Sequence, residues 1–599
     1  MRRVLSVLGT IALLITGPLP ARAATEQGSG TVLATGDRVT MVDGVPVVQP
    51  GPGRDKVPFV TRVAGGRVRV AAADALASPA TFTLPAAKTP AAKTLAAKTP
   101  AAKTVAPEPA VTTTYQVTFV HIGFDGLAAT DYQTSLLSED FATYYDVFPR
   151  GSATIEVPAG VYLLDGFIVG GDSTGMKAAE LVQPRFTVAG DTTVVLDARS
   201  AKPSSLTVPD ATAQVAMASA HYTYTNAAGL QTEGGVFTGG WNSLYTAHLG
   251  ADVPGFASSI AGQWITPSGG EAYAVRYNQD GRMISGYHRD TQPAELATVT
   301  TTFAGGNDPG LAVDWYAVSR LPGEETHAAA VAYAAPVPGT IVRHFNGEGP
   351  TQWRTRVYES WGECFGCAVT TGAWTAYRGG ASVAETFNGA VVSPSLPGPE
   401  VTWHSGVRRT GDTIAVDLPM YADGAGHPGD SGDTGSTVLY RDGVETGREE
   451  WGGAGAFAVP AVDARYRLVA QSHRGTPYAL STDVTAAWEF RSAYAPSRVL
   501  PLWEIRFAPR LDDRNTALSR DLVMPVRLTP APGARVGAIR DVTVDVSVDD
   551  GATWTCAPYA AGLALVRHPA GHGFVSLRGS VRDSDGNSAT LTVIRAYRY

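Results

Sequence analysis

The sequence predicts an all-β protein made of several antiparallel β-sandwich domains, Ig-like or jelly-roll-like, together with a small N-terminal β module. The 599-residue chain contains 66 Gly and 40 Pro with no collagen-like period, which indicates many turns between short strands. Apolar and polar residues alternate over long stretches, as in YQVTFVHI at 115–122 and VTVDVSVDD at 542–550. A chain of this length also forms several domains, each large enough for its own core.

The first 23 residues have the pattern of a secretory signal peptide. Two arginines precede an apolar run from Val4 to Ile15, and Ala21 and Ala23 form an A-x-A cleavage site. The apolar run is shorter than the roughly 18 residues that a membrane anchor needs. We therefore expect a secreted, extracellular protein whose mature chain begins near Ala24 and contains no membrane span.

The remaining chain divides by composition. Residues 24–84 are predicted to form the N-terminal module, because valines alternate with polar residues around turn signals at Asp43-Gly44 and Gly65-Gly66. Residues 85–109 are predicted to be a linker, since the PAAKT-type repeats from Pro85 to Thr104 cannot bury enough apolar area to offset the entropy of ordering. The expected domains beyond it are a sandwich at 110–202, a β-rich domain at 203–400, a sandwich at 401–495 and an Ig-like sandwich at 496–599.

Charge and cysteine content narrow the function classes. The net charge of −8 is mild for this length, and no basic stripe with interleaved aromatic residues is present, so no nucleic-acid partner is expected. Cys364 and Cys367 form a C-x-x-C, and in an oxidising compartment this pair is predicted to close a local disulfide, while Cys556 stands alone. The surroundings lack the helix of a thioredoxin-like redox site and the second ligand pair of a zinc site.

The strongest candidate for a catalytic motif lies at 426–443, GHPGDSGDTGSTVLYRDG. Its G-D-S-G, centred on Ser431, is the pattern around the nucleophile of chymotrypsin-like peptidases, and the YTAH run ending at His248 faintly resembles their histidine motif. A nucleophilic serine needs a histidine within hydrogen-bond reach and a carboxylate that orients it. Asp433 replaces the expected next Gly, and an aspartic peptidase would need a second D-T-G-S loop. We interpret the stretch as a Gly/Asp loop between strands, with His248 and His427 as the histidines to test.

Three further patterns are interpreted as loops and turns. His568 and His572 have the spacing of a helical metal pair, but Pro569 and Gly571 lie between them, so loop histidines are expected. The DSDGN turn at 583–587 offers calcium ligands, yet a polar DG turn needs no ion. SVDDGATW at 547–554 matches a single Asp box, which predicts a hairpin turn because propellers repeat this motif in every blade. No catalytic, cofactor-binding or metal-binding residue is therefore predicted.

Several phrases are similar to the non-catalytic regions of multidomain secreted subtilisin-like serine peptidases of high-GC Gram-positive bacteria. TGDRVT and PGPGR, within 35–54, resemble the segment that follows the signal peptide in that family. VPAGVY, DTTVVLDAR, STVLYRDGVETG and VRDSDGNSATLTVIRAYRY resemble the domains downstream of its catalytic domain. The family motifs H-G-T and G-T-S-M-A are absent from the chain. The resemblance implies accessory domains with a linker where the peptidase domain would stand.

The expected function is that of a secreted, non-catalytic accessory protein with no cofactor. Its expected partner is an extracellular protein, a peptidase, the cell wall or another polysaccharide. Most tryptophans of the 203–400 region are expected in the core, and a minority on an exposed face would stack on sugar rings. The alternative is a secreted hydrolase, either a degenerate serine peptidase or a glycan-active enzyme whose two carboxylates come from separate strands.

Overall fold

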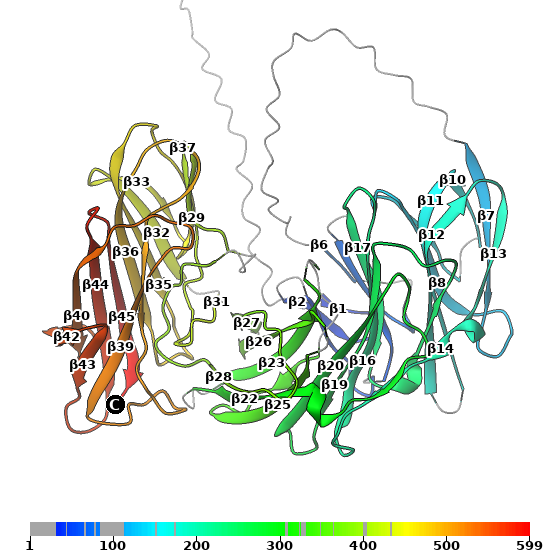
Figure 1. The fold of residues 1–599 in the computed structure, drawn as a ribbon, viewed down its shortest axis with the longest axis horizontal. Helices are drawn as coiled ribbons and strands as arrows, with labels where there is room; N and C mark the ends of the chain where they lie inside the picture. Colours follow the sequence, from blue (N-terminus) through cyan, green and yellow to red (C-terminus); the bar gives the residue numbers. More distant parts are fainter. Residues whose placement is uncertain are drawn as a thin grey trace, which may run out of the picture.

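Figure 1 shows the computed structural model, which describes residues 31–83 and 113–599 apart from gaps at 43–44, 55, 65–66, 77–79, 150–152, 173–174, 306–309, 323, 325–330, 348, 363, 399–403 and 432–433. The predicted signal peptide (1–23) and repeat linker (85–109) lie outside the described residues. Within these ranges the chain forms β-strands and no α-helix, so the all-β prediction is confirmed. Most strand pairs are antiparallel, and the 3₁₀-helices η1, η2 and η3 span Ala198–Ser200, Trp241–Ser243 and Pro293–Glu295.

Two sheets, built from strands within 114–203 and from β18 (Leu244–His248), pack face to face. Phe119 and Leu196 of the smaller sheet pack against Leu136, Leu164 and Ile168 of the larger one. The smaller sheet has the order β10-β7-β13 and consists of β7 (Thr114–Ile122), β10 (Thr154–Pro158) and β13 (Thr192–Asp197). The larger sheet has the order β14-β18-β12-β11-β8-β9 and consists of β8 (Asp131–Ser138), β9 (Tyr144–Val147), β11 (Gly160–Asp172), β12 (Gly175–Val188), β14 (Lys202–Pro203) and β18 (Leu244–His248).

The larger sheet is buried on both faces. Successive side chains of a strand point to opposite faces, and along β11 they alternate between two cores. Leu164 and Ile168 lie in the core just described, whereas Leu163 and Phe167 lie in a second core on the opposite face. The six-stranded sheet is therefore the middle layer of a three-layer arrangement.

The third layer is a ten-stranded sheet with the order β28-β22-β25-β20-β19-β16-β17-β4-β5-β6. Tyr222 and Val236 of this sheet share the second core with Phe167. The strands of this sheet that follow residue 112 are β16 (Gln214–Thr225), β17 (Gln231–Thr238), β19 (Phe256–Ile265), β20 (Glu271–Asp280), β22 (Leu296–Phe303), β25 (Gly339–Asn346) and β28 (Ser382–Phe387). A short parallel pair, β15 (Ser205–Thr207) with β21 (His288–Asp290), lies outside it.

Three of the six described N-terminal strands belong to the same ten-stranded sheet. Strands β4 (Phe59–Ala64), β5 (Arg67–Ala72) and β6 (Ala80–Thr83) extend it from β17, and β4 pairs with β17 in antiparallel register. β1 (Thr31–Val32), β2 (Arg38–Val42) and β3 (Val45–Gln49) form a separate three-stranded sheet. The β2–β3 and β4–β5 pairs flank the two predicted turns, so the expected hairpins are present, although the turn residues themselves are not described.

A five-stranded sheet packs on the end of the ten-stranded sheet. Phe303 and Phe345 of the ten-stranded sheet contact Trp315 and Val357 of the five-stranded one in a common core. The five-stranded sheet has the order β24-β23-β26-β27-β31. Its strands are β23 (Ala312–Arg320), β24 (Tyr333–Ala334), β26 (Gln352–Trp361), β27 (Cys364–Thr371) and β31 (Gly429–Ser431).

The C-terminal part has one continuous core, from Ala390 to Tyr597, and it forms the yellow-to-red body in Figure 1. The eight-stranded sheet, order β33-β32-β35-β36-β45-β44-β40-β41, contains β32 (Thr434–Arg441), β33 (Val444–Glu449), β35 (Ala464–His473), β36 (Asp483–Ser492), β40 (Ile539–Ser547), β41 (Thr555–Cys556), β44 (Phe574–Asp583) and β45 (Ser588–Arg598). A four-stranded sheet contains β29 (Gly406–Gly411), β30 (Thr413–Asp417), β34 (Ala454–Ala458) and β37 (Ala495–Val499), and another contains β38 (Trp503–Phe507), β39 (Asp521–Pro530), β42 (Tyr559–Ala560) and β43 (Leu563–Arg567).

Sheets cross several of the predicted domain boundaries. β36 and β45 pair across the boundary expected at 495/496, β12 and β18 pair across the one at 202/203, and β4 and β17 pair across the linker. The local sequence pattern gives no sign of these pairings, because alternation specifies a strand and its two faces without specifying its neighbour. The domain limits stay predictions, and the sheets show where neighbouring units are joined.

Candidate functional site

No catalytic triad is seen among the described side chains of the G-D-S-G stretch and the two histidines named with it. Ser431 lies at the end of β31, where its backbone pairs with Ala368 of β27, and its side chain lies outside the described residues, as does Asp433. His248 belongs to β18 of a different sheet. Its Nδ1 accepts a hydrogen bond from the Met283 N–H at 3.1 Å, and its Nε2 lies 3.1 Å from the Ala251 carbonyl oxygen. His248 is therefore held by backbone groups, with the exposed Asp252 carboxylate 3.9 Å from its Nε2.

His427, by contrast, is oriented by a carboxylate. Its Nδ1 lies 2.9 Å from Oδ2 of Asp423, and its ring stacks on Phe387 with ring centroids 4.3 Å apart. The other oxygen of Asp423 accepts three backbone N–H bonds, from residues 425, 426 and 427, each 3.0 Å long. These bonds fix the loop that leads into β31. The sequence pattern indicated His427 but not Asp423. The signal that could have indicated Asp423 is its position four residues before His427, within one tight loop.

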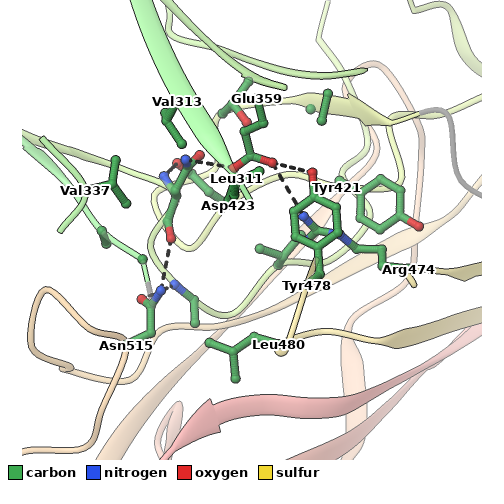
Figure 2. Close-up of a pocket in the computed structure, with 18 of the residues that line it drawn as sticks. Leu311, Val313, Val337, Glu359, Tyr421, Asp423, Arg474, Tyr478, Leu480 and Asn515 are labelled. Atoms are coloured by element: carbon green, nitrogen blue, oxygen red, sulfur yellow. Dashed lines mark hydrogen bonds and ion pairs between the residues drawn. The ribbon is translucent and has the colours of Figure 1, made fainter. Parts of the chain in front are cut away.

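Asp423 lines a small cavity between the five-stranded sheet and the C-terminal body (Figure 2). The cavity volume is about 70 Å³, which has room for a few water-sized groups and not for a sugar ring or a peptide. The five-stranded sheet and the sheets packed with it form the first body, and the C-terminal part is the second body. The apolar walls of the cavity come from the first body and from the loop after β35 of the second. The lining side chains include Leu311, Val313, Val337 and Leu480 as apolar groups, and Glu359, Asn388, Asp423, Arg474, Tyr478 and Asn515 as polar groups.

Glu359 of β26 is the central polar group of this cavity. The Tyr478 hydroxyl donates to Glu359 Oε2, the Asn388 side-chain N–H donates to Oε1 at 3.0 Å, and the Arg474 guanidinium lies 3.8 Å from Oε2. Arg474 also stacks on the Tyr478 ring at 3.5 Å. Burial, and then the charge of Glu359, raise the pKa of Tyr478 well above its ordinary value, so the phenol remains a donor. Figure 2 shows the side chains of Glu359, Arg474 and Tyr478 converging at the cavity.

A second set of bonds joins the two bodies beside Glu359. The Ala390 N–H donates to the Asn515 side-chain oxygen at 2.7 Å, and the Asn515 side-chain N–H donates to the Asn388 carbonyl at 3.2 Å. The Asn388 N–H in turn donates to Asp423 at 3.2 Å. The polar side chains around the cavity thus hold the two bodies together, and the local sequence carries no sign of them because their partners lie far away in the chain.

Among the cysteines and histidines noted in the sequence, Cys367 and His568 are held by protein partners. Cys367 is disulfide-bonded and Cys556 is an exposed free thiol, while the side chain of Cys364, the predicted partner, lies outside the described residues. His568 is buried between the Ser519 carbonyl and the Tyr597 hydroxyl, each 3.0 Å away. Burial lowers the pKa of His568. Within the described ranges, no group of three or more His, Cys, Asp or Glu side chains is arranged to hold a metal ion.

Both carboxylate-rich turns are held by protein groups. Asp583 accepts N–H bonds from residues 537, 585 and 587, and its Oδ2 also accepts from the Trp503 indole at 3.1 Å. The Asp box forms the predicted hairpin turn: Asp550 and Gly551 adopt positive φ angles of 54° and 85°, and Asp549 accepts from the Thr553 N–H at 2.9 Å. The interpretation of SVDDGATW as a turn is confirmed.

The tryptophans of the 203–400 region are divided between core and half-buried positions. Trp264, Trp315 and Trp353 are buried, as expected. Trp241, Trp361 and Trp374 are half-buried. The Trp374 ring, for example, is covered by two guanidinium groups, those of residues 320 and 354, at 4.3 and 4.4 Å. The guanidinium groups occupy the space over the Trp374 ring where a sugar would stack. Sugar stacking on the other half-buried rings stays a prediction.

The C-terminal body exposes an apolar sheet face made of Val523 and Pro525 on β39 and Leu563 and Leu565 on β43. Val523 pairs with Leu565, and Pro525 pairs with Leu563. Val523, Leu563 and Leu565 are 56%, 45% and 41% exposed, whereas the alternate residues of both strands belong to the core. An Asp521–Arg567 ion pair of 2.8 Å closes one end of this face.

No protein-family model and no curated protein sequence matches the chain. Similar solved structures include the N-terminal eight Ig domains of Down syndrome cell adhesion molecule isoform 1.30.30, with 11% identity and a TM-score of 0.13 over 81% of this chain and 58% of that one. The major pilin subunit BcpA of Bacillus cereus aligns with 8% identity and a TM-score of 0.10 over 46% of this chain and 99% of that one. The TIE protein of Bacillus anthracis aligns with 8% identity and a TM-score of 0.11 over 76% and 69%. The described part of the chain contains no helix long and apolar enough to cross a bilayer.

Proposed function

We propose that this protein is a secreted, non-catalytic accessory protein that binds an extracellular protein through the exposed apolar face of β39 and β43. The observation that carries the proposal is the register that places Val523 beside Leu565 and Pro525 beside Leu563 on the solvent side of a sheet. The solvent side of an antiparallel sheet is ordinarily polar, and contiguous exposed apolar surface is typical of protein-binding sites. The side chains are aliphatic, which favours a protein over a sugar ring as the ligand.

The accessory role also rests on the sequence resemblance. The phrases shared with the non-catalytic regions of subtilisin-like peptidases suggest a protein that acts beside such an enzyme, on its substrate or on the enzyme itself. The cavity around Glu359 supports the same interpretation, because its polar side chains bind one another and its volume of about 70 Å³ does not admit a polymer substrate.

The binding face is tested with the double variant Val523→Asp/Leu565→Asp. Purified mature chain is applied to immobilised denatured casein, insoluble cell wall, chitin and cellulose. We expect retention on the protein matrix by the wild type and by a control, Val444→Asp, which changes a 70% exposed apolar side chain on the edge strand β33. The double variant should lose at least about tenfold in affinity while unfolding at the wild-type temperature. Equal retention of all three proteins would contradict the proposal.

A second candidate function, a degenerate serine hydrolase, is favoured by one observation. Asp423 orients His427 through Nδ1, as the carboxylate does in a Ser-His-Asp triad, and the backbone of Ser431 follows in β31. Casein zymography with a serine-directed inhibitor separates the two functions. The accessory role predicts no clearing by wild type. Clearing that is lost in both Ser431→Ala and His427→Ala would establish the hydrolase instead.

A further inference from the structure

Residues 31–83 are attached to the rest of the protein by an extensive non-covalent contact. β4 adds to the edge of β17 with Val63 opposite Glu233 and Phe59 opposite Phe237, and the two phenylalanine rings stack with centroids 5.4 Å apart. The Thr232 hydroxyl donates to the Val63 carbonyl at 2.7 Å. Backbone pairing of this kind provides affinity, and side-chain pockets provide selectivity, when a strand is added to a sheet edge.

The selective pocket is formed by Asp165 of β11, Glu180 of β12 and Tyr222 of β16. These side chains project into the apolar layer between the six-stranded and ten-stranded sheets, and Arg62 of β4 enters the same layer. One guanidinium nitrogen lies 2.5 Å from Asp165 Oδ1, and the other lies 3.1 Å from Glu180 Oε1. The Tyr222 hydroxyl donates to Asp165 Oδ2 at 2.6 Å.

The ionisable side chains of this pocket are almost completely buried. The Arg62 side chain is 7% exposed, and the two carboxylates are 3% and 0% exposed. A carboxylate buried in this layer needs a cation, because the interior of the layer solvates charge poorly. Val60 and Ala64, which flank Arg62 on the same face of β4, fill the apolar surroundings. The site is thus complementary to an extended strand that carries an arginine between small apolar residues.

The N-terminal unit is also internally connected. Arg54 donates to Asp37 at 2.9 Å and to Asp74 at 2.7 Å, which links the sheet of β1–β3 to the end of β5. Val48 and Val70 share a core with Phe237. The contacts therefore join residues 31–83 to one another as well as to β17, and Arg62 is the buried charged group among them.

We propose that the edge of β17 with the Asp165–Glu180–Tyr222 pocket is a strand-acceptor site, and that residues 31–83 occupy it as a separable unit that a second copy of this chain can supply. By sequence, 30 residues separate Thr83 from Thr114. A covalent connection raises the effective concentration of the unit at its own site far above that of a unit from another copy, so the intact chain fills its own site. Once the connection is cut, units from different copies compete equally.

The test uses the full chain with the recognition sequence of a specific protease placed within 85–104. Two preparations, one labelled with ¹⁵N, are folded, cleaved and mixed, and native mass spectrometry follows the complexes. We expect each cleaved protein to elute from gel filtration as a single complex and to form hybrid-mass complexes after overnight mixing. Release of the N-terminal piece from the wild type on cleavage would overturn the proposal, and so would retained complexes that never form hybrids.

Arg62 is tested against a matched arginine of the same hairpin. Arg62→Met should release the N-terminal piece at least about 100-fold faster than Arg67→Met, because Arg67 is exposed at the start of β5. Both substitutions are introduced into the cleavable full chain, and circular dichroism before cleavage establishes that each variant is folded. Equal release rates for the two variants would contradict the role assigned to the pocket. If Arg62→Met does not fold, the double variant Asp165→Asn/Glu180→Gln, which replaces both carboxyl groups of the pocket, should show the faster release instead.

Discussion

Glu180 provides the sharpest prediction about stability. Its side chain is fully buried in the apolar layer, 3.1 Å from the Arg62 guanidinium. Burial, together with the nearby charge of Asp165, raises the pKa of Glu180 from 4.5 to about 8, although Arg62 opposes the shift. The folded protein therefore keeps a proton that the unfolded chain releases. Because the folded-state pKa is the higher one, the free energy of unfolding must fall as the pH rises from about 4.5 to about 8.

The magnitude follows from the size of the shift. Each pH unit inside this window should remove about 1.4 kcal/mol from the free energy of unfolding of the wild type. Glu180→Gln has no proton to release, so the difference between the two proteins should change by about 3 to 4 kcal/mol between pH 5 and pH 8, in favour of the variant at high pH. Replacing the carboxyl group by an amide also changes the free energy of unfolding by an amount that does not depend on pH. This change leaves the predicted dependence on pH unaltered.

The assay is pulse proteolysis in urea at pH 5, 6.5 and 8, with peptide mass spectrometry reporting the unfolding of residues 114–303. A region-specific signal is needed because a chain with several cores need not unfold in one step. Glu156→Gln, at an exposed position of β10, is the control and should keep the wild-type slope. If Glu180→Gln keeps the wild-type slope as well, the carboxyl is ionised in the folded state and the reasoning fails.

Three further predictions concern other parts of the chain. Tyr478→Phe removes the hydroxyl that donates to Glu359 and should lower the free energy of unfolding by about 1–3 kcal/mol in calorimetry, whereas the same change at the exposed Tyr494 should have no effect. Asp583→Ala leaves the Trp503 indole and several backbone N–H groups without an acceptor and should cost about 3 kcal/mol, while EGTA should leave the melting temperature of the wild type unchanged; a melting temperature that falls with EGTA would indicate a calcium site. Iodoacetamide should label Cys556 in the native protein and reach no other cysteine before reduction, and mass spectrometry of the alkylated peptides would expose any second label.

The sequence predicted only part of the candidate site. The G-D-S-G pattern drew attention to Ser431 and to His427, but it gave no reason to single out Asp423, which orients His427 through a tight loop. Glu359 and Tyr478 are separated by more than a hundred residues, and only the packing of the five-stranded sheet on the C-terminal body brings them together. Pair interactions of this kind carry no local signature.

The sequence by itself determined that the chain forms strands, because alternating apolar residues and frequent Gly and Pro favour short β-strands joined by turns. It also determined local turns such as the one at Asp550-Gly551, where the residue types favour positive φ. Only the tertiary structure decided which strands are neighbours: β4 beside β17, and β36 beside β45. Any strand with one apolar face satisfies many partners equally well, so the choice depends on complementary packing and on buried charges such as Arg62 and Asp165, which meet only in the folded protein.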